Sequence, residues 1–209
     1  MEDWRKCLEE NKFVAAILMD LSKAFDCLPH DLLLLKIINY GVSDSALKLL
    51  DSYLSNRKQC IKIGSVCSSF SEIYKGVPQG SILGPVLFST FINDIFCFIS
   101  KSSWYNYADD NTLSYSDTDI NRLTNVLQEE SKVLITWFND NQMQANPDKF
   151  QAIAVGKKTH DENISFNLDG NIIKYDDEVK LLGVTFDFML NFNSHISNTM
   201  YLQKGFSTS

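Results

Sequence analysis

The sequence predicts an α+β fold built on a largely antiparallel sheet, and three observations support that prediction. Apolar runs at Val14–Met19 and Trp104–Ala108 have the length and composition of strands. Strand-forming residues flank the turn signals Asp109-Asp110 and Asp169-Gly170, which indicates hairpins. Apolar residues recur at helical spacing over Ile120–Phe138. Strands that are both paired in hairpins and separated by helices are typical of the α+β class.

Two helices and a strand pair are predicted after the first strand. His30-Asp31 is a capping signal before the leucine-rich run Leu32–Ile38, and Gly41 stops the helix. A second helix is predicted from Asp44 or Ser45 to about Leu54. The segments Cys60–Ile63 and Phe70–Tyr74 are expected to pair as strands across a Gly-Ser loop.

The second half of the chain predicts one further helix and several short strands. Pro85 opens a segment with near-helical apolar spacing that extends to Phe98. The predicted strands are Thr112–Tyr115, Gln151–Val155, Ile164–Leu168, Ile172–Tyr175 and a single final strand, Val179–Phe186.

Bulk properties predict an ordinary globular protein that is intracellular, in the cytoplasm or nucleus, and not secreted. The chain has 209 residues, 44% of them hydrophobic and 22% charged. The acidic start and the lack of an apolar run of about 20 residues exclude a secretory signal and predict no membrane partner. The net charge of −7 is the reverse of what proteins show when they bind nucleic acid mainly through phosphates. Either the chain does not bind nucleic acid, or the binding surfaces lie outside it.

Acidic residues follow directly after two predicted strands: Asp20 after the first, and Asp109 and Asp110 after the second. If these strands are neighbours, three carboxylates meet at one edge, where like charges raise the pKa of one of them. Mg²⁺ relieves this conflict because it binds one or two carboxylates together with substrate phosphates, and two ions can serve a phosphoryl transfer. The alternative is that Asp109 and Asp110 form a plain turn before Asn111, and that Asp20 caps a helix.

The segment Gly76–Pro85 holds three glycines and two prolines in ten residues. Such a composition fixes an irregular turn before a helix, where backbone can approach a ligand closely. Gln79 offers both a donor and an acceptor there. A loop kept rigid for packing is an equally good interpretation.

Five segments in this order resemble the motifs of reverse transcriptases from non-LTR, LINE-like retrotransposons, and the resemblance covers residues 13 to 196. The first has an Asp before a Lys-Ala-Phe-Asp run, the second is G-V-P-Q-G-S-x-L-G-P, and the third is Y-x-D-D. In sequence order the segments are Leu18–His30, Gly76–Asp94, Tyr107–Asp110, Asn146–Gly156 and Leu181–His195.

The resemblance implies an RNA-directed DNA polymerase, a nucleotidyltransferase with a palm and part of the fingers. Asp20, Asp109 and Asp110 are then the catalytic residues and the ligands of two Mg²⁺ ions, with Mn²⁺ as a substitute. The partners implied are an RNA template, a DNA primer and deoxynucleoside triphosphates. The primer 3′-hydroxyl attacks the α-phosphate, so the protein supplies mainly positioning and charge neutralisation.

The resemblance also assigns four substrate-binding residues. Phe25 matches the bulky residue that blocks a ribose 2′-hydroxyl, and Gln79 and Gly80 match positions that line the nucleotide and template pocket. Lys149 matches a basic residue near the triphosphate, where it can protonate pyrophosphate. Taken singly, Phe25 is equally a core aromatic and Lys149 a solvated lysine.

The motifs divide the chain into residues 1–27, palm with the first catalytic strand; 28–76, partial fingers or connecting segment; 77–196, palm with the remaining motifs; and 197–209, the truncated start of a thumb or a tail. Family members carry fingers, thumb and endonuclease segments beyond these motifs, so we expect a fragment that lacks most of the fingers and thumb and cannot extend a primer alone. One alternative is a catalytically incompetent remnant that binds only metal or nucleotide. Another is a different palm-like enzyme such as a nucleotide cyclase, against which Phe25 and the Gly76–Pro85 segment speak.

Overall fold

The computed structural model describes residues 2–21, 23–156, 165–168 and 170–206, and the chain divides into two compact units. The first unit contains Met1–Asp20, Phe98–Ile135 and Asn146–Ser209. The second contains Leu21–Cys97 and Thr136–Ala145. Within the described part of the chain, no helix is long and apolar enough to cross a membrane.

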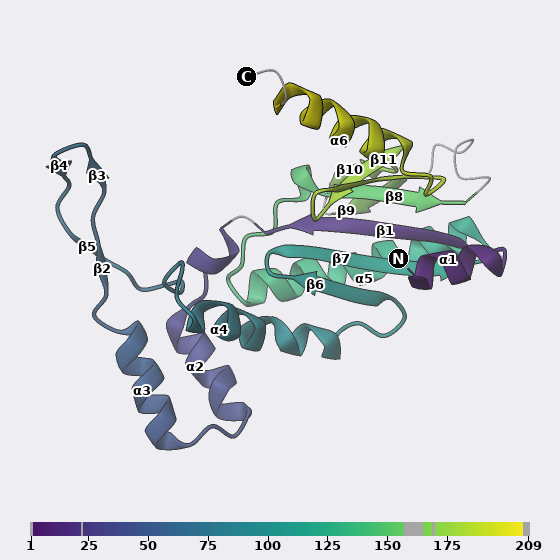
Figure 1. Ribbon diagram of the computed structural model, residues 1–209. Coiled ribbons are helices and arrows are strands. Elements are labelled where there is room, and N and C mark those ends of the chain that lie inside the picture. The colour runs from purple at the N-terminus through teal and green to yellow at the C-terminus, as the bar shows by residue number, and fades with distance from the viewer. Residues whose placement is uncertain (1, 22, 157–164, 169, 207–209) are drawn as a thin grey trace. The chain divides into compact units, whose positions relative to one another are not determined.

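A four-stranded antiparallel sheet forms the centre of the first unit (Figure 1). Its order is β6 (Ser103–Tyr107), β7 (Asp110–Asp117), β1 (Phe13–Asp20) and β8 (Gln151–Val155). The central strand β1 is buried along its whole length except at its two ends, which explains its unbroken apolar run. The sheet together with the helices confirms the predicted α+β fold.

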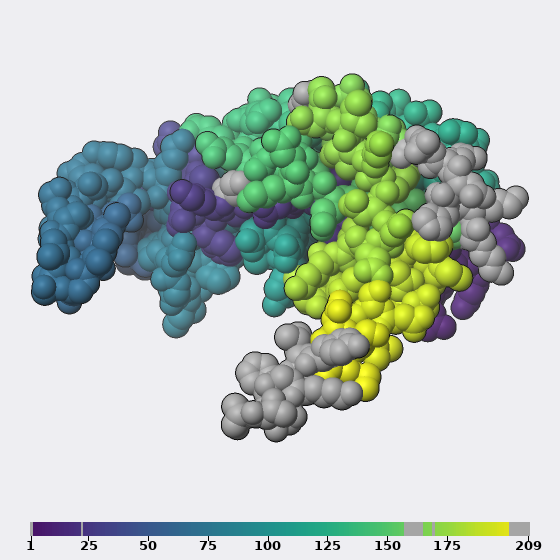
Figure 2. All heavy atoms as spheres, turned by 90° about the horizontal axis from the view of Figure 1, so that it is seen from above, coloured from purple at the N-terminus to yellow at the C-terminus, as the bar shows by residue number. Residues whose placement is uncertain are grey.

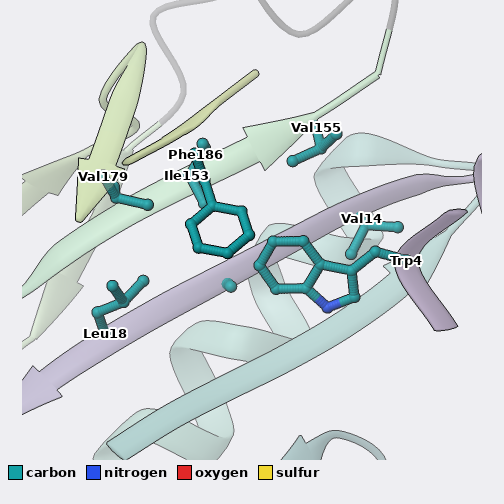
Figure 3. Packing of buried hydrophobic residues seen from close by; sticks show 8 residues of the cluster. Trp4, Val14, Leu18, Ile153, Val155, Val179 and Phe186 are labelled. Atoms are coloured by element: carbon teal, nitrogen blue, oxygen red, sulfur yellow. The ribbon is translucent and has the colours of Figure 1, made fainter. Parts of the chain in front are cut away.

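One face of the sheet carries a hydrophobic cluster (Figure 3). Side chains alternate along a strand, so Val14, Ala16 and Leu18 of β1 all point to this face, and Asp20 is next in the same series. The cluster is completed by residues from β8, from α1 (Glu2–Glu9), and from β11 (Glu178–Leu181) and β12 (Val184–Asp187): Trp4, Ile153, Val155, Val179 and Phe186. The site described below therefore begins where this apolar face ends.

The C-terminal part of the first unit is built from two hairpins and a helix. The hairpins are β9 (Ser165–Leu168) with β10 (Asn171–Lys174), and β11 with β12; the helix is α6 (Asn193–Phe206). Ile164 and Asp169 of the first predicted hairpin lie outside the described residues, as do residues 207–209 of the predicted tail. Figure 2 shows the two hairpins and the coloured part of α6, drawn from lime to yellow, on one face of the unit.

The prediction of a single strand over Val179–Phe186 is wrong. Leu182 and Gly183 have φ values of 49° and 82° and form a two-residue turn that folds the segment into the β11–β12 hairpin. A turn with two left-handed residues matches the twist of antiparallel strands. The helix α1 was not predicted either.

The second unit is mainly helical. It contains α2 (His30–Asn39), α3 (Asp44–Leu54) and α4 (Leu83–Ile92), which agree with the predicted helices, although α4 ends six residues before Phe98 and continues as the 3₁₀ helix η2 (Asn93–Cys97). The long helix α5 (Ile120–Asp140) has its first part in the first unit and its last turns in the second. Two further 3₁₀ turns are η1 (Ala24–Asp26) in this unit and η3 (Pro147–Lys149) in the first.

The predicted strand pair in the second unit is an interrupted ribbon. It consists of four two-residue strands: β2 (Lys58–Gln59), β3 (Lys62–Ile63), β4 (Val66–Cys67) and β5 (Ser71–Glu72). The register shifts by one residue between the two short ladders, and there the Ile61 amide donates to the hydroxyl of Ser68 (2.9 Å). The prediction that Cys60–Ile63 pairs with Phe70–Tyr74 is therefore wrong in extent and in pairing, because β3 pairs with β4 and β5 pairs with β2.

Candidate active site

Two of the three predicted catalytic aspartates lie directly opposite each other. Asp20 ends β1, Asp110 begins β7, and the two are partners in the antiparallel register. Directly opposite residues share a face of the sheet and have Cβ atoms about 5 Å apart. Tyr107 of β6 pairs with Asp110, which leaves Ala108 and Asp109 as the two-residue turn between β6 and β7. The structure thus brings the three carboxylates to one edge of the sheet.

The carboxylates repel one another. Partial burial, followed by the negative charges of Asp109 and Asp20, raises the pKa of Asp110 above its ordinary value. Among the described residues, Asp20 forms an ion pair with Lys149, whose Nζ lies 3.5 Å from the Asp20 Oδ2. Both side chains of that pair are substantially exposed, 60% for Lys149 and 43% for Asp20, so solvent screens the attraction.

A small pocket of about 80 Å³ opens beside these residues. Leu18, Asp20 and Asp110 line it from the sheet, while Lys149 and Lys180 bring two positive charges to its rim. Lys180 belongs to β11, and sequence reasoning missed it because the β11–β12 hairpin was not predicted. An anionic group that enters this pocket therefore meets two lysines next to two carboxylates.

The described residues include no group of three or more His, Cys, Asp or Glu side chains arranged as a complete metal site. The donor set is nevertheless one that suits Mg²⁺, which takes one or two carboxylates and fills its remaining positions with water and phosphate oxygens. A cation shared between Asp20 and Asp110 also relieves the repulsion that raises the pKa of Asp110. The edge fits a metal held jointly by protein and phosphate, and not a cage made of protein alone.

Phe25, Gln79 and Gly80 belong to the second compact unit and lie near one another there. The amide of Val77 donates to the Phe25 carbonyl (2.9 Å), which holds the glycine-rich loop against the segment that carries Phe25. The Gln79 Nε2 donates to both carboxylate oxygens of Asp26, at 3.0 and 3.2 Å. The half-buried ring of Phe25 packs on Phe88, with 4.6 Å between ring centroids.

Glycine is required in this loop at Gly76. Its φ is 84°, and a Cβ there would lie 2.7 Å from the Cα of Asp26. The Gly76 amide donates to the Leu28 carbonyl (2.7 Å), and the Gly76 carbonyl oxygen lies 2.7 Å from His30 Nε2. A side chain at this position would push the loop off the Phe25 segment. Gly80 also has a left-handed φ, of 76°, but a Cβ there would meet no atom within 4 Å.

The family model described as "Reverse transcriptase (RNA-dependent DNA polymerase)" matches residues 2–186 of the chain. The chain is 30% identical to the probable RNA-directed DNA polymerase from transposon BS of Drosophila melanogaster, over 93% of the chain and 22% of that protein. It is 28% identical to the RNA-directed DNA polymerase from mobile element jockey of the same species, over 97% of the chain and 22% of that protein.

A more distant relative is the Pol polyprotein from type-1 retrotransposable element R2 of Popillia japonica, 25% identical over 85% of the chain and 31% of that protein. The chain therefore spans about a fifth to a third of these relatives' lengths. Among solved structures, telomerase from Candida albicans in complex with a fragment of telomeric RNA is similar, with a TM-score of 0.62, 13% identity, and coverage of 91% of this chain and 33% of that one. Apo telomerase from Candida tropicalis gives a TM-score of 0.61 at 14% identity, covering 90% of this chain and 37% of that one. These likenesses support the fold.

Proposed function

Because the chain belongs to the reverse transcriptase family, of the type found in non-LTR retrotransposons, we propose that it supplies the palm of an RNA-directed DNA polymerase. The observation that carries the proposal is the register pairing of Asp20 with Asp110, with Asp109 in the adjoining turn. The chain covers only 22% of the first two relatives, so polymerase activity is proposed for the longer protein to which such a palm belongs.

Reverse transcriptases depend on divalent metal, and we assign two Mg²⁺ ions, replaceable by Mn²⁺, to Asp20, Asp109 and Asp110. When bound, the ions neutralise charge on the attacking and leaving oxygens. The three aspartates would hold these ions where the reacting phosphate binds, because phosphoryl transfer asks the protein mainly for positioning and charge neutralisation. Lys149 is proposed to contact the triphosphate, which is supported by the small pocket that Lys149 and Lys180 line together with Asp20 and Asp110.

The substrates proposed are an RNA template, a DNA primer and deoxynucleoside triphosphates. Phe25 is proposed to exclude a ribose 2′-hydroxyl, and Gln79 and Gly80 to line the nucleotide and template pocket. The domain assignment stays a proposal: palm over residues 1–27 and 77–196, fingers or connection over 28–76, and thumb or tail from 197. The cytoplasmic or nuclear location also stays a prediction.

The test is metal-dependent nucleotide binding by this chain, followed by primer extension by a longer protein that contains it. We expect a fluorescent deoxynucleoside triphosphate to bind only with Mn²⁺ or Mg²⁺, and Asp109→Asn to abolish that binding. Glu9→Gln is the matched control, since it removes one negative charge from the exposed end of α1. Metal-dependent extension of a DNA primer on an RNA template supports polymerase function. If nucleotide binds but neither this chain nor a longer protein that contains it extends the primer, the remnant alternative is supported. A lack of metal-dependent nucleotide binding overturns both the polymerase and the remnant hypotheses.

A further inference from the structure

Two asparagines hold the turn that carries Asp109. Asn106 and Asn111 are register partners, one pair further from the turn than Tyr107 and Asp110. The Asn106 Nδ2 donates to the Ala108 carbonyl oxygen (2.8 Å) and to the Asn111 Oδ1 (2.7 Å). The Asn111 Nδ2 donates to the Asp109 carbonyl oxygen (2.8 Å). Both carbonyl groups of the turn are therefore bound by side-chain amides that are also bound to each other.

This network stabilises a backbone conformation that is unfavourable for the residues of the turn. Ala108 has a φ of 54°, in the left-handed region that a residue with a Cβ disfavours. Its carbonyl and the next one are held by amides whose own positions are fixed. Asn111 is only 1% exposed, and one amide nitrogen of Asn106 uses both of its hydrogens. Such a closed network over-determines the turn and keeps the strained form populated.

The two amides also lie on the side of the sheet away from the carboxylates. Since side chains alternate along a strand, Asn111 points to the face opposite to Asp110. Asn111 pairs across the sheet with Met19, which is buried, whereas Asp110 pairs with Asp20. Asn111 also borders the small pocket beside Asp20 and Asp110, so the network lies next to the space that metal and phosphate need.

We propose that Asn106 and Asn111 are a coupled pair of positioning residues that hold the carboxylate of Asp109 in its metal-binding position. The inference rests on the proposed function, in which Asp109 is a metal ligand. Neither asparagine touches the reacting atoms; each acts through the backbone of the turn. Loss of either amide lets the Ala108-Asp109 turn relax, so the carboxylate spends less time where a shared ion requires it.

The experiment measures Mn²⁺ affinity of the full chain by electron paramagnetic resonance, together with the thermal unfolding midpoint of each variant. Asn106→Ala and Asn111→Ala should each weaken Mn²⁺ binding about three- to tenfold, the effect of one or two lost neutral hydrogen bonds. Because the pair acts as one unit, the double variant should lose less than the product of the two single effects. The matched control is Asn141→Ala, which removes an equivalent bond from a buried asparagine amide to a carbonyl, that of Trp137 (2.8 Å), in the other compact unit.

A merely structural role makes a different prediction. In that case all three variants lower the unfolding midpoint, and the folded proteins bind Mn²⁺ as the unmodified chain does; this result overturns the inference. Equal weakening by Asn141→Ala overturns it too. If the unmodified chain binds no Mn²⁺, the proposed metal role of the aspartates fails first. If the unmodified chain binds and Asp109→Asn does not, normal binding by Asn106→Ala refutes the positioning role alone.

Discussion

Asp110→Asn should stabilise the metal-free chain and remove its stabilisation by Mg²⁺. Like charges directly opposite each other in a sheet destabilise it by about 0.2–1 kcal/mol, and Asp20 and Asp110 are such a pair. The ion pair between Lys149 and Asp20 is exposed and offsets little of this. Removing one charge therefore raises the free energy of unfolding by about 0.5 kcal/mol, which is about 1–2 °C in the unfolding midpoint for a chain of this length.

Mg²⁺ should reverse the order of stability of the unmodified chain and Asp110→Asn. With free Mg²⁺ at ten times its dissociation constant, the unmodified chain gains about 1.4 kcal/mol, or about 3–6 °C. The variant has lost a ligand and gains far less. Asp110→Asn should thus be the more stable protein without metal and the less stable one with it.

The pH dependence provides a further check with a definite sign. The pKa of Asp110 is raised in the folded chain above its ordinary value of 3.8, so its charged form destabilises folding at neutral pH. That penalty is lost as the pH falls through the raised pKa of the folded chain, and it is gone below 3.8, where both states are protonated. The advantage of Asp110→Asn in metal-free buffer should therefore shrink on acidification.

The assay is thermal unfolding by circular dichroism, with chelator and with a Mg²⁺ titration, at several pH values. Glu9→Gln controls for the loss of one negative charge elsewhere and should follow the unmodified chain. A lower midpoint of Asp110→Asn in chelator would refute the repulsion argument. Equal Mg²⁺ stabilisation of both proteins would show that Asp110 is not a ligand.

Three further outcomes are expected. Phe25→Ala should reduce the preference for dATP over ATP in Mn²⁺-dependent binding; a loss of about 3–5 kcal/mol in stability with unchanged preference would mark a ring that only fills the core. Asp117→Asn should destabilise by about 1.5–3 kcal/mol, because Arg122 Nε donates to this carboxylate at 2.7 Å. The Arg122 bond lowers the Asp117 pKa to about 2, so its stabilisation is complete above 3.8 and lost as pH falls toward 2; acid titration of Asp117→Asn should lack that loss. Ala108→Gly should raise the free energy of unfolding by up to about 1 kcal/mol, since glycine adopts a φ of 54° freely; a lower unfolding midpoint would show that the methyl group packs.

The parts of the fold that sequence predicted well are those with an unambiguous periodicity. The strand β8 and the helix α3 have the predicted bounds because an apolar run or a helical stripe continues up to a polar stop. The β11–β12 turn gave no such signal. A leucine at a φ of 49° is rare, so Leu182 in the sequence does not indicate a turn, and Gly183 alone is a weak turn signal.

The site divides in the same way. The three aspartates could be placed together because residues that end one antiparallel strand and begin its neighbour meet at the same edge. Lys180 could not, because its position depends on a hairpin formed far along the chain. Asn106 and Asn111 carried no motif of their own, and their bonds to the turn follow from register, which no local pattern specifies.

The charges at this edge link metal and nucleotide into one binding event. The chain carries a net charge of −7, and three carboxylates gather where a triphosphate would sit. The ion pair between Lys149 and Asp20 is exposed and weak, so we expect Lys149 to move readily from Asp20 to a phosphate. A cation that takes its place on Asp20 both removes the repulsion and releases the lysine toward the phosphate. Metal and triphosphate then strengthen each other's binding by the same factor, as linkage requires. Under the proposed function, we therefore expect this acidic site to bind a triphosphate only together with a divalent metal.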